Sequence, residues 1–305
     1  LLHQKFVLYR KKNGSLVALN ANCPHAGANM AKGRIEEDRL VCPFHAWAYG
    51  ESGICEKIPG TDCIPKFARV ANFPVKEQHG MVFLYYGRRP KFDLPFFPGK
   101  DPNEFFCSPK TVTIYQDAHW WTVCANAWDL QHFWHVHNRV PRETPVYDYP
   151  EPYVANVTFK SKVAGKNLAD RFMRWVSGED VDLELTTYCG NLMLSVSKFG
   201  DVHNYMMSFN EQTGEQTSVT HILFFSEGAK RSWFWRFGRT LRMILQAIIS
   251  KSFFQWESDT LKDVDYNTRT LHPNDADLKR VLEWLEKVTN EPPLRDDATQ
   301  ETLSV

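Results

Sequence analysis

The sequence has no excess of charge of either sign. Among its 305 residues, lysine and arginine together number 36, the same as aspartate and glutamate. This balance provides no long-range attraction to nucleic acid or to an anionic membrane surface. It therefore argues against a nucleic-acid-binding protein, and it leaves room for a local patch that binds a redox partner.

Cysteine is scarce, and long apolar runs are missing. Seven cysteines without a secretory signal do not make a full disulfide framework, so we expect a reducing, cytoplasmic compartment. No apolar run is long enough to span a bilayer. The nearest, residues 241–249, is expected to be a core-facing helix. The chain opens inside an expected strand, so upstream sequence such as a membrane anchor could precede residue 1.

Short strands and turns fill the first ninety or so residues. "FVLYR" and "SLVAL" flank a Lys-Lys-Asn-Gly turn, a pattern typical of a β-hairpin. Residues 91–106 are rich in proline and turn formers and are expected to be a linker. The sequence thus predicts an all-β domain over 1–95, with a second domain over 96–305.

The second domain mixes helical and strand patterns. Residues 119–137 lack Gly and Pro and are expected to form a helix, and several strand-like runs between 153 and 226 predict a sizeable antiparallel sheet. Residues 240–268 and 277–288 are expected to be helical, followed by a polar tail. The fold class expected for the whole chain is α+β.

Two short motifs each combine one cysteine and one histidine. Cys23 and His25 lie in "CPH", and sixteen residues separate His25 from "CPFH", which holds Cys42 and His45. A structural zinc site is the alternative, but zinc fingers usually pair Cys with Cys and His with His. Mixed motifs suit a [2Fe–2S] cluster in which one iron has two Cys ligands and the other has two His ligands.

The segment "CPHAGANMAKGRIEEDRLVCPFHAW" resembles the Rieske domain of ring-hydroxylating oxygenases. The chain departs from the family at Ala46, where the family usually has Gly, and the extra methyl is expected to tighten the loop. Imidazole ligands raise the cluster potential, and we expect His25 and His45 to keep a ring edge near solvent or a partner. The other cysteines are expected to be ordinary apolar residues: Cys55, Cys63, Cys107, Cys124 and Cys189.

A second constellation begins at Asn126, in the pattern N-x2-D-x2-H-x4-H. By itself this pattern is only moderately specific. The oxygenase family carries it after a Rieske domain, and the resemblance implies that His132 and His137 bind a mononuclear Fe(II), with Asn126 and Asp129 as further functional residues. His135 also lies in this segment and could compete as a ligand, but the family spacing favours His137. The catalytic domain implied is a helix-grip fold, an antiparallel sheet with helices.

Two histidines and a carboxylate leave coordination positions open on ferrous iron, so a third ligand is needed. Helical register favours Glu257, which shares an apolar stripe with Phe253 and Leu261, because a carboxylate there is costly unless it is paired or bound to a metal. The family's usual aspartate favours Asp259. We expect Glu257, with Asp259 as the alternative.

Asp129 precedes His132 by about one helical turn. It is expected to accept a hydrogen bond from the His132 ring and so orient it. In similar enzymes this aspartate also reaches a cluster-ligating histidine, here His45, of a neighbouring subunit. The resemblance thereby implies a homotrimer built head to tail.

No G-x-G-x-x-G fingerprint occurs in the chain, so electrons from NAD(P)H must come from a separate flavin-dependent reductase, ferredoxin or both. The resemblance implies a terminal oxygenase that uses O₂ on a hydrophobic, sterol-like or aromatic molecule. "SGICEKIP", "VHNRVP" and "LKRVLEWLEKV" look most like the ketosteroid 9-alpha-hydroxylase and cholesterol-desaturase branch. Apolar residues of 241–254 and the sheet over 183–225 are expected to line the cavity. The alternative is a Rieske-type electron carrier or a binding protein with a degenerate iron site.

Overall fold

The computed structural model describes residues 5–290 except 88, 109, 167–170, 172–173, 175–177, 201, 229–232 and 265. Contacts divide the chain into two compact units, the first over Leu1–Leu94 and the second over Pro95–Glu291. The start of the chain and most of the expected polar tail lie outside the described residues.

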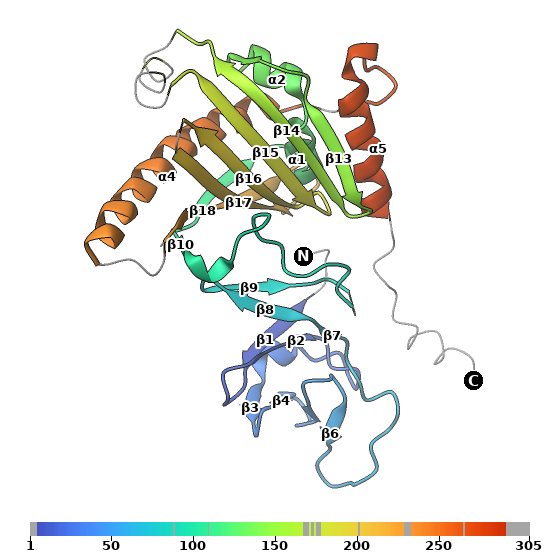
Figure 1. Ribbon diagram of the computed structural model, residues 1–305. Helices are drawn as coiled ribbons and strands as arrows, with labels where there is room; N and C mark the ends of the chain where they lie inside the picture. The colour runs from blue at the N-terminus through green and yellow to red at the C-terminus, as the bar shows by residue number, and fades with distance from the viewer. Residues whose placement is uncertain are drawn as a thin grey trace. The chain divides into compact units, whose positions relative to one another are not determined.

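Small antiparallel sheets make up the first unit (Figure 1). The expected hairpin is confirmed, since β1 and β2 pair antiparallel on either side of the Lys-Lys-Asn-Gly turn. β1, β2 and β7 form one sheet, β3 to β6 form a second, and β8 pairs with β9. The strands are β1 (Phe6–Arg10), β2 (Leu16–Asn20), β3 (Arg34–Glu36), β4 (Arg39–Val41), β5 (Ala48–Tyr49), β6 (Cys55–Lys57), β7 (Asn72–Phe73), β8 (Val75–Gln78) and β9 (Met81–Leu84).

One core joins the first two of these sheets. It gathers Leu19, Met30, Leu40 and Tyr49, all nearly inaccessible to solvent. Cys23 and Cys42 belong to the same core. The two cysteines of the mixed motifs are therefore fixed by apolar packing, which suits a preformed site.

The second unit is built on a nine-stranded antiparallel sheet, which confirms the expected α+β class. The strand order is β10-β18-β17-β16-β15-β14-β12, with β11 paired to β18 and β13 to β14. The strands are β10 (Phe105–Cys107), β11 (Val112–Gln116), β12 (Arg139–Pro141), β13 (Val146–Glu151), β14 (Val154–Val163), β15 (Asp180–Tyr188), β16 (Leu192–Phe199), β17 (Val202–Gln212) and β18 (Ser218–Glu227).

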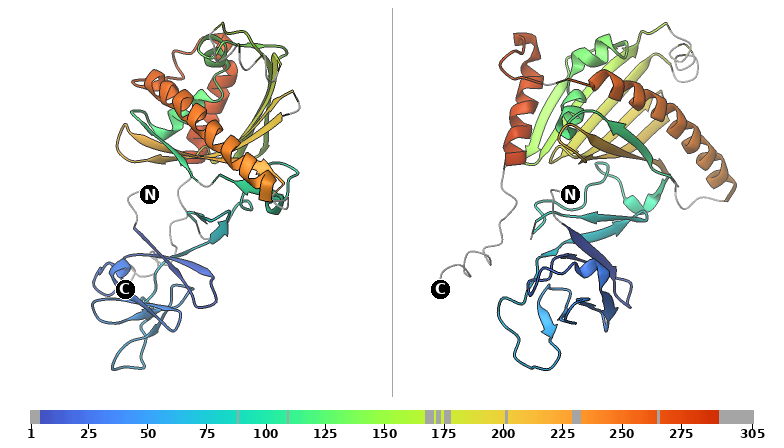
Figure 2. Two further views of the ribbon diagram at one scale, coloured as in Figure 1. Left: turned by 90° about the vertical axis from the view of Figure 1, so that its left-hand side faces the viewer. Right: turned by 180° about the vertical axis from the view of Figure 1, so that it is seen from behind.

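Helices α1 (Trp120–Asn126) and α4 (Trp233–Leu261) cover one side of this sheet, and α5 (Ala276–Asn290) lies along its β13–β14 edge (Figures 1 and 2). α1 and α5 share a core with inner residues of β14 and β15, among them Val157 and Leu185. α4 packs through Met243 against Ile114 and Ile222 of β11 and β18. The helices expected over 240–268 and 277–288 are confirmed, although α4 starts earlier and ends at Leu261.

Two expectations about helices need correction. The segment 119–137 is not one helix, because α1 ends at Asn126 and α2 (Leu130–His135) begins after Asp129, whose backbone is extended. The 241–249 run faces the core only in part. Met243 is buried, whereas Ile244 and Ile248 are 44% and 59% exposed. No helix among the described residues is long and apolar enough to cross a membrane.

Candidate metal centres

The two Cys/His loops of the first unit share one backbone pattern. The Cys23 carbonyl accepts from the N–H of Gly27, and the Cys42 carbonyl accepts from that of Ala46, each four residues on. The N–H of each cysteine donates to the carbonyl five residues on, those of Ala28 and Trp47. The two loops thus share the same pair of backbone hydrogen bonds around the cysteine, while the histidine lies two residues after Cys23 and three after Cys42.

The four side chains of these loops differ in exposure. Cys23 and Cys42 are buried, whereas His25 and His45 are exposed, as expected of imidazoles near solvent or a partner. The two histidine rings lie 4.6 Å apart between centroids. Buried thiols and neighbouring imidazoles fit a cluster with two sulfur and two nitrogen ligands.

Two residues that the sequence patterns did not single out surround this site. The Tyr49 hydroxyl lies 3.1 Å from Cys23 Sγ, and the Trp47 indole stacks on His25 at 4.4 Å. Burial raises the pKa of the Cys23 thiol, and the Tyr49 hydrogen bond opposes that rise. A hydroxyl at a ligating sulfur tunes a cluster's potential. Their only signal in the sequence is their position just after His45.

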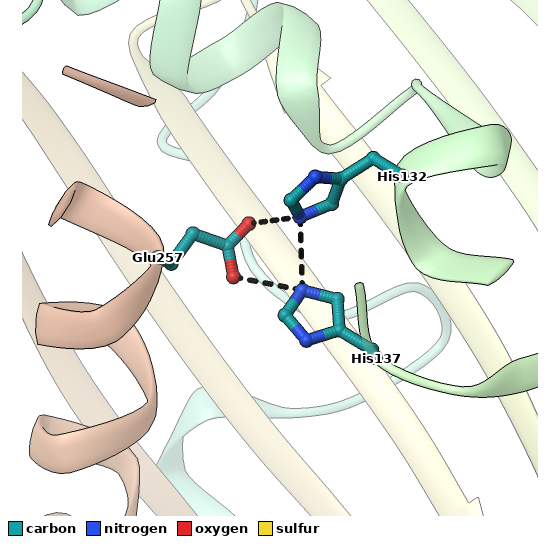
Figure 3. A group of neighbouring side chains, drawn as sticks. All are labelled: His132, His137 and Glu257. Carbon is teal, nitrogen blue, oxygen red and sulfur yellow. Dashed lines mark hydrogen bonds and ion pairs between the residues drawn. The ribbon is translucent and has the colours of Figure 1, made fainter. Parts of the chain in front are cut away.

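Three side chains from distant segments converge in the second unit. His132 Nε2 lies 3.1 Å from Glu257 Oε1, and His137 Nε2 lies 3.0 Å from Glu257 Oε2. The two Nε2 atoms lie 3.0 Å apart. Figure 3 shows the imidazoles and the carboxylate pointing toward one another. Two nitrogens and a carboxylate are the donor set expected for non-haem Fe(II).

Local structure explains how these donors meet. His132 lies in α2, and His137 follows the end of that helix. The next residue, Asn138, has a φ of +52°, a left-handed conformation that asparagine tolerates better than most residues. The chain turns there into β12. Glu257 comes from α4, which ends at Leu261, just before Asp263 adopts a φ of +66°.

The site is buried, and its carboxylate is ionised. The side chains of His132, His137 and Glu257 are only 8%, 4% and 13% exposed. Burial raises the pKa of Glu257, but its contacts with His132 and His137 outweigh burial and hold that pKa at about 2. A buried anion facing two imidazoles fits a cation-binding site, because a metal ion would neutralise it.

Two residues considered from the sequence lie outside this group. Asp259 is exposed, contacts Gln255 and lines a polar groove of about 440 Å³. Glu257, and not the alternative Asp259, therefore meets the histidines.

His135 is exposed and stacks on Trp134. The groove includes no residue of 241–254, so the lining expected for a substrate cavity stays a prediction.

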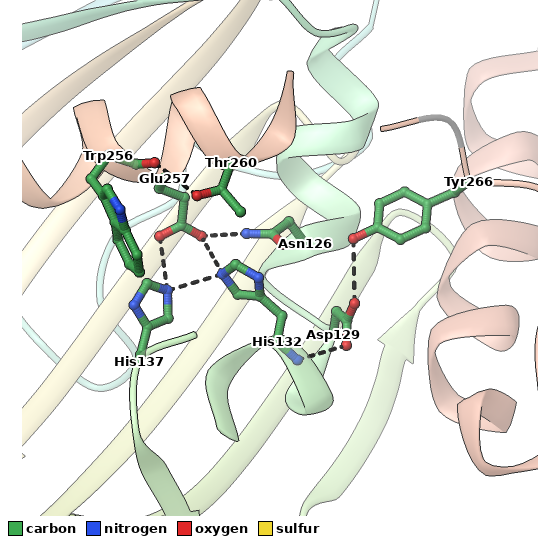
Figure 4. A network of polar contacts seen from close by, with 8 residues as sticks. All are labelled: Asn126, Asp129, His132, His137, Trp256, Glu257, Thr260 and Tyr266. Carbon is green, nitrogen blue, oxygen red and sulfur yellow. Dashed lines mark hydrogen bonds and ion pairs between the residues drawn. The ribbon is translucent and has the colours of Figure 1, made fainter. Parts of the chain in front are cut away.

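Asp129 contacts the backbone of His132 instead of its ring. Its Oδ1 accepts from the His132 backbone N–H at 3.0 Å, which caps α2, and its Oδ2 accepts from the Tyr266 hydroxyl at 3.4 Å (Figure 4). The expected ring hydrogen bond is absent from the contacts of these described residues. Asp129 thus orients His132 by fixing the start of its helix. Tyr266 was not anticipated from the sequence.

Comparisons with known proteins support the cluster site first. The family model described as the Rieske [2Fe-2S] domain matches residues 1–71. Cholesterol 7-desaturase nvd 1 of Ciona intestinalis is 33% identical over 140 residues, 45% of this chain and 30% of that protein. The 3-ketosteroid-9-alpha-monooxygenase oxygenase component of Rhodococcus rhodochrous is 28% identical over 167 residues, 53% of this chain and 41% of that one. The chain therefore spans well under half the length of these relatives.

Solved structures share the fold over nearly the whole chain. Apo dicamba monooxygenase has a TM-score of 0.62 at 17% identity. The match covers 93% of this chain and 88% of the dicamba monooxygenase chain. The QL mutant of Pseudomonas putida CBB5 NdmA with caffeine has a TM-score of 0.63 at 16% identity, and the match covers 95% of this chain and 81% of that one. The chain thus joins a Rieske domain to a second domain in the fold of Rieske oxygenases. It is similar to proteins named as oxygenase components, and the family model that matches its first unit implies a [2Fe–2S] cluster. Its second unit brings together a His/Glu group that could hold a metal ion.

Proposed function

We propose that this protein is the terminal oxygenase of a multicomponent Rieske system. One observation carries the proposal: residues more than a hundred positions apart, His132 and Glu257, meet with His137 in a buried two-histidine, one-carboxylate group. A purely electron-carrying Rieske protein has no use for such a group. We assign these three residues as the ligands of Fe(II). We assign Cys23, His25, Cys42 and His45 as the ligands of the cluster, which the match to the Rieske domain supports.

The chain's own residues hold and orient the proposed centres. When bound, the cluster supplies electrons and the ferrous ion supplies O₂ activation. Glu257 contributes a negative charge that is already ionised, so metal binding at this residue needs no loss of a proton at neutral pH. Asp129 fixes the helix that carries His132. The low exposure of the three donors excludes bulk water from them.

Partners follow from what the chain carries and from its relatives. We propose a flavin-dependent NAD(P)H reductase, a ferredoxin or both as the electron source, since no dinucleotide fingerprint occurs in the sequence. The exposed rings of His25 and His45 give a redox partner access to the cluster. We further propose a head-to-tail homotrimer in a cytoplasmic compartment, in line with the free cysteines.

A hydrophobic small molecule is the proposed substrate. Aromatic rings flank His137, with Phe253 at 4.5 Å, Phe133 at 5.5 Å and Trp256 at 5.6 Å between centroids. Phe253 and Trp256 are 38% and 49% exposed, so they offer apolar surface beside the proposed iron. Relatives are named for cholesterol, ketosteroids and chlorobenzoate, which supports a sterol-like or aromatic substrate.

Metal analysis of the anaerobically reconstituted full chain tests this proposal. We expect about three irons per chain, with the visible and EPR signals of a cluster that has two histidine ligands. His132→Ala should lower the content by one iron, keep the cluster signals and abolish oxidation of steroid or aromatic substrates. His135→Ala, a change at the exposed neighbouring histidine, is the matched control and should keep all the iron.

Other results would point elsewhere. Two irons in the wild-type chain would favour a Rieske electron carrier or a binding protein with a degenerate second site. Zinc in place of iron would exclude both. Unchanged turnover by His132→Ala would show that the mononuclear site is assigned to the wrong residues.

A further inference from the structure

We propose that Asn126 is a positioning residue for Glu257 and holds its carboxylate in place for the metal. The inference rests on the proposed function, since it takes His132, His137 and Glu257 as the iron ligands. It adds a fourth residue whose role is defined by a contact rather than by its place in a motif.

The contact joins two segments that are 131 residues apart. Asn126 ends α1, is 3% exposed, and donates from Nδ2 to Oε1 of Glu257 (Figure 4). This is the same oxygen that faces His132, whereas Oε2 faces His137. Asn126 and the two histidines therefore surround the carboxylate from different elements.

Hydrogen-bond chemistry fixes which end of the amide faces Glu257. An ionised carboxylate can only accept, so the NH₂ group must point toward it. The other end, Oδ1, is buried and has no hydrogen-bond partner among the described residues. An unpaired buried acceptor is costly and is tolerated mainly where the group serves a function. The contact with Glu257 is thus what orients this amide.

A glutamate ligand benefits from such an anchor. Its side chain has three rotatable torsions, so ordering it costs more conformational entropy than ordering a shorter side chain. A hydrogen bond from a buried, rigid neighbour removes part of that cost before the metal arrives. Residues that orient ligands in this way typically change metal affinity by about 10–100-fold when they are replaced.

Cobalt(II) titration of the full chain tests the inference, after selective removal of the mononuclear metal with the cluster retained. Asn126→Leu keeps the approximate size but removes the donor, and we expect binding weakened by about 10–100-fold with an altered cobalt d–d spectrum. Asn126→Ala is the second variant should leucine not fit. Asn210→Leu is the matched control, a buried asparagine of the same unit that accepts from Thr220 and does not contact the metal group. It should change stability but not cobalt affinity or the cobalt spectrum.

A double-mutant cycle separates positioning from general structural damage. Glu257→Asp is one methylene shorter and withdraws the carboxylate from Asn126, so Asn126→Leu should cost little further affinity in that background. Wild-type affinity in Asn126→Leu, or equal losses in both backgrounds, would overturn the inference. A wild-type chain that binds no cobalt dependent on His132 would instead overturn the proposed iron site itself.

Discussion

At the scale of single residues, the two cluster loops differ at one equivalent position. Gly27 and Ala46 both donate to a cysteine carbonyl, and both have left-handed backbones, with φ of +72° and +57°. Glycine adopts this conformation freely, but alanine pays roughly 1–2 kcal/mol in steric strain. Ala46 was expected to tighten the loop, and its effect is backbone strain at this residue.

Replacing Ala46 by glycine should stabilise the protein. Relief of strain outweighs the extra freedom that glycine gives the unfolded chain, so we expect a gain of about 0.5–1 kcal/mol in the free energy of unfolding. Gly27→Ala is the reverse change. No atom lies within 4 Å of its added Cβ, so backbone strain alone should destabilise it. Chemical denaturation of both variants measures the effect. A loss of stability in Ala46→Gly would contradict it.

The buried carboxylate Glu257 should give the iron-free protein a distinctive response to acid. Its pKa is about 2 in the folded chain against 4.5 for an ordinary glutamate. A lowered folded-state pKa stabilises the fold above about pH 4.5, and this contribution is lost as the pH falls toward 2. By the usual conversion, the contribution near neutral pH is on the order of 3 kcal/mol.

Glu257→Gln removes that contribution. The difference in unfolding free energy between wild type and Glu257→Gln should therefore be largest near pH 6 and shrink as the pH is lowered to 3. Asp259→Asn, a change at an exposed carboxylate of the same helix, should follow the wild-type curve closely. A difference that stays constant with pH would mean that the charge of Glu257 does not stabilise the fold.

At the scale of elements, Asp129 connects the α1–α2 break to the metal site. It accepts from the His132 N–H at the first turn of α2, the contact of an N-cap residue. Asparagine caps about as well as aspartate, whereas alanine costs about 1 kcal/mol. We expect Asp129→Asn to keep its stability and bound iron, and Asp129→Ala to lose stability and bind iron more weakly.

Thermal unfolding and iron content distinguish these two variants. If Asp129→Asn and Asp129→Ala lose stability equally, the charge of Asp129 contributes more to stability than its hydrogen bond to the His132 N–H. If Asp129→Asn stays folded and loaded with iron but turns over slowly, the charge of Asp129 serves turnover and not folding.

The contrast between α2 and α4 shows what the sequence could predict. Register within one helix sufficed to prefer Glu257 over Asp259, because Glu257 and the buried Leu261 lie one turn apart on the same side of α4. Glu257 does meet the two histidines, even though Phe253, on the same predicted stripe, is 38% exposed. The break before α2 was missed, because an aspartate that caps a helix and one inside a helix look alike in a segment without Gly or Pro.

Contacts between residues that are far apart in the chain could not be predicted from the sequence. Asn126 was picked from a motif, but its partner Glu257 lies 131 residues away and is brought near only by the tertiary fold of the second unit. Tyr266, which donates to Asp129, belongs to no motif. Tertiary packing decides such pairs, and no local pattern encodes them.

At the scale of the whole molecule, the proposed cluster ligands and the proposed iron ligands lie in two different compact units. A cluster in the first unit is useful for oxidation only if its electrons reach the iron in a second unit. The proposed head-to-tail trimer supplies that route between neighbouring subunits, since a heterologous contact that closes on itself makes a ring. The route can be tested by separating the two centres on different chains.

Two inactive variants should therefore restore activity when they are assembled together. His45→Ala removes a proposed cluster ligand, and His132→Ala removes a proposed iron ligand. With electrons crossing between subunits, a junction works when an intact cluster faces an intact iron. Each trimer that contains both variants then has one working junction of three, so the doubly purified complex should give about a third of wild-type activity. Co-expression with two affinity tags, followed by turnover measurements on the doubly purified complex, tests this. Each variant expressed alone is the control, and both should elute at the wild-type oligomeric size. A mixed complex as inactive as its parents would mean that electrons do not pass between subunits.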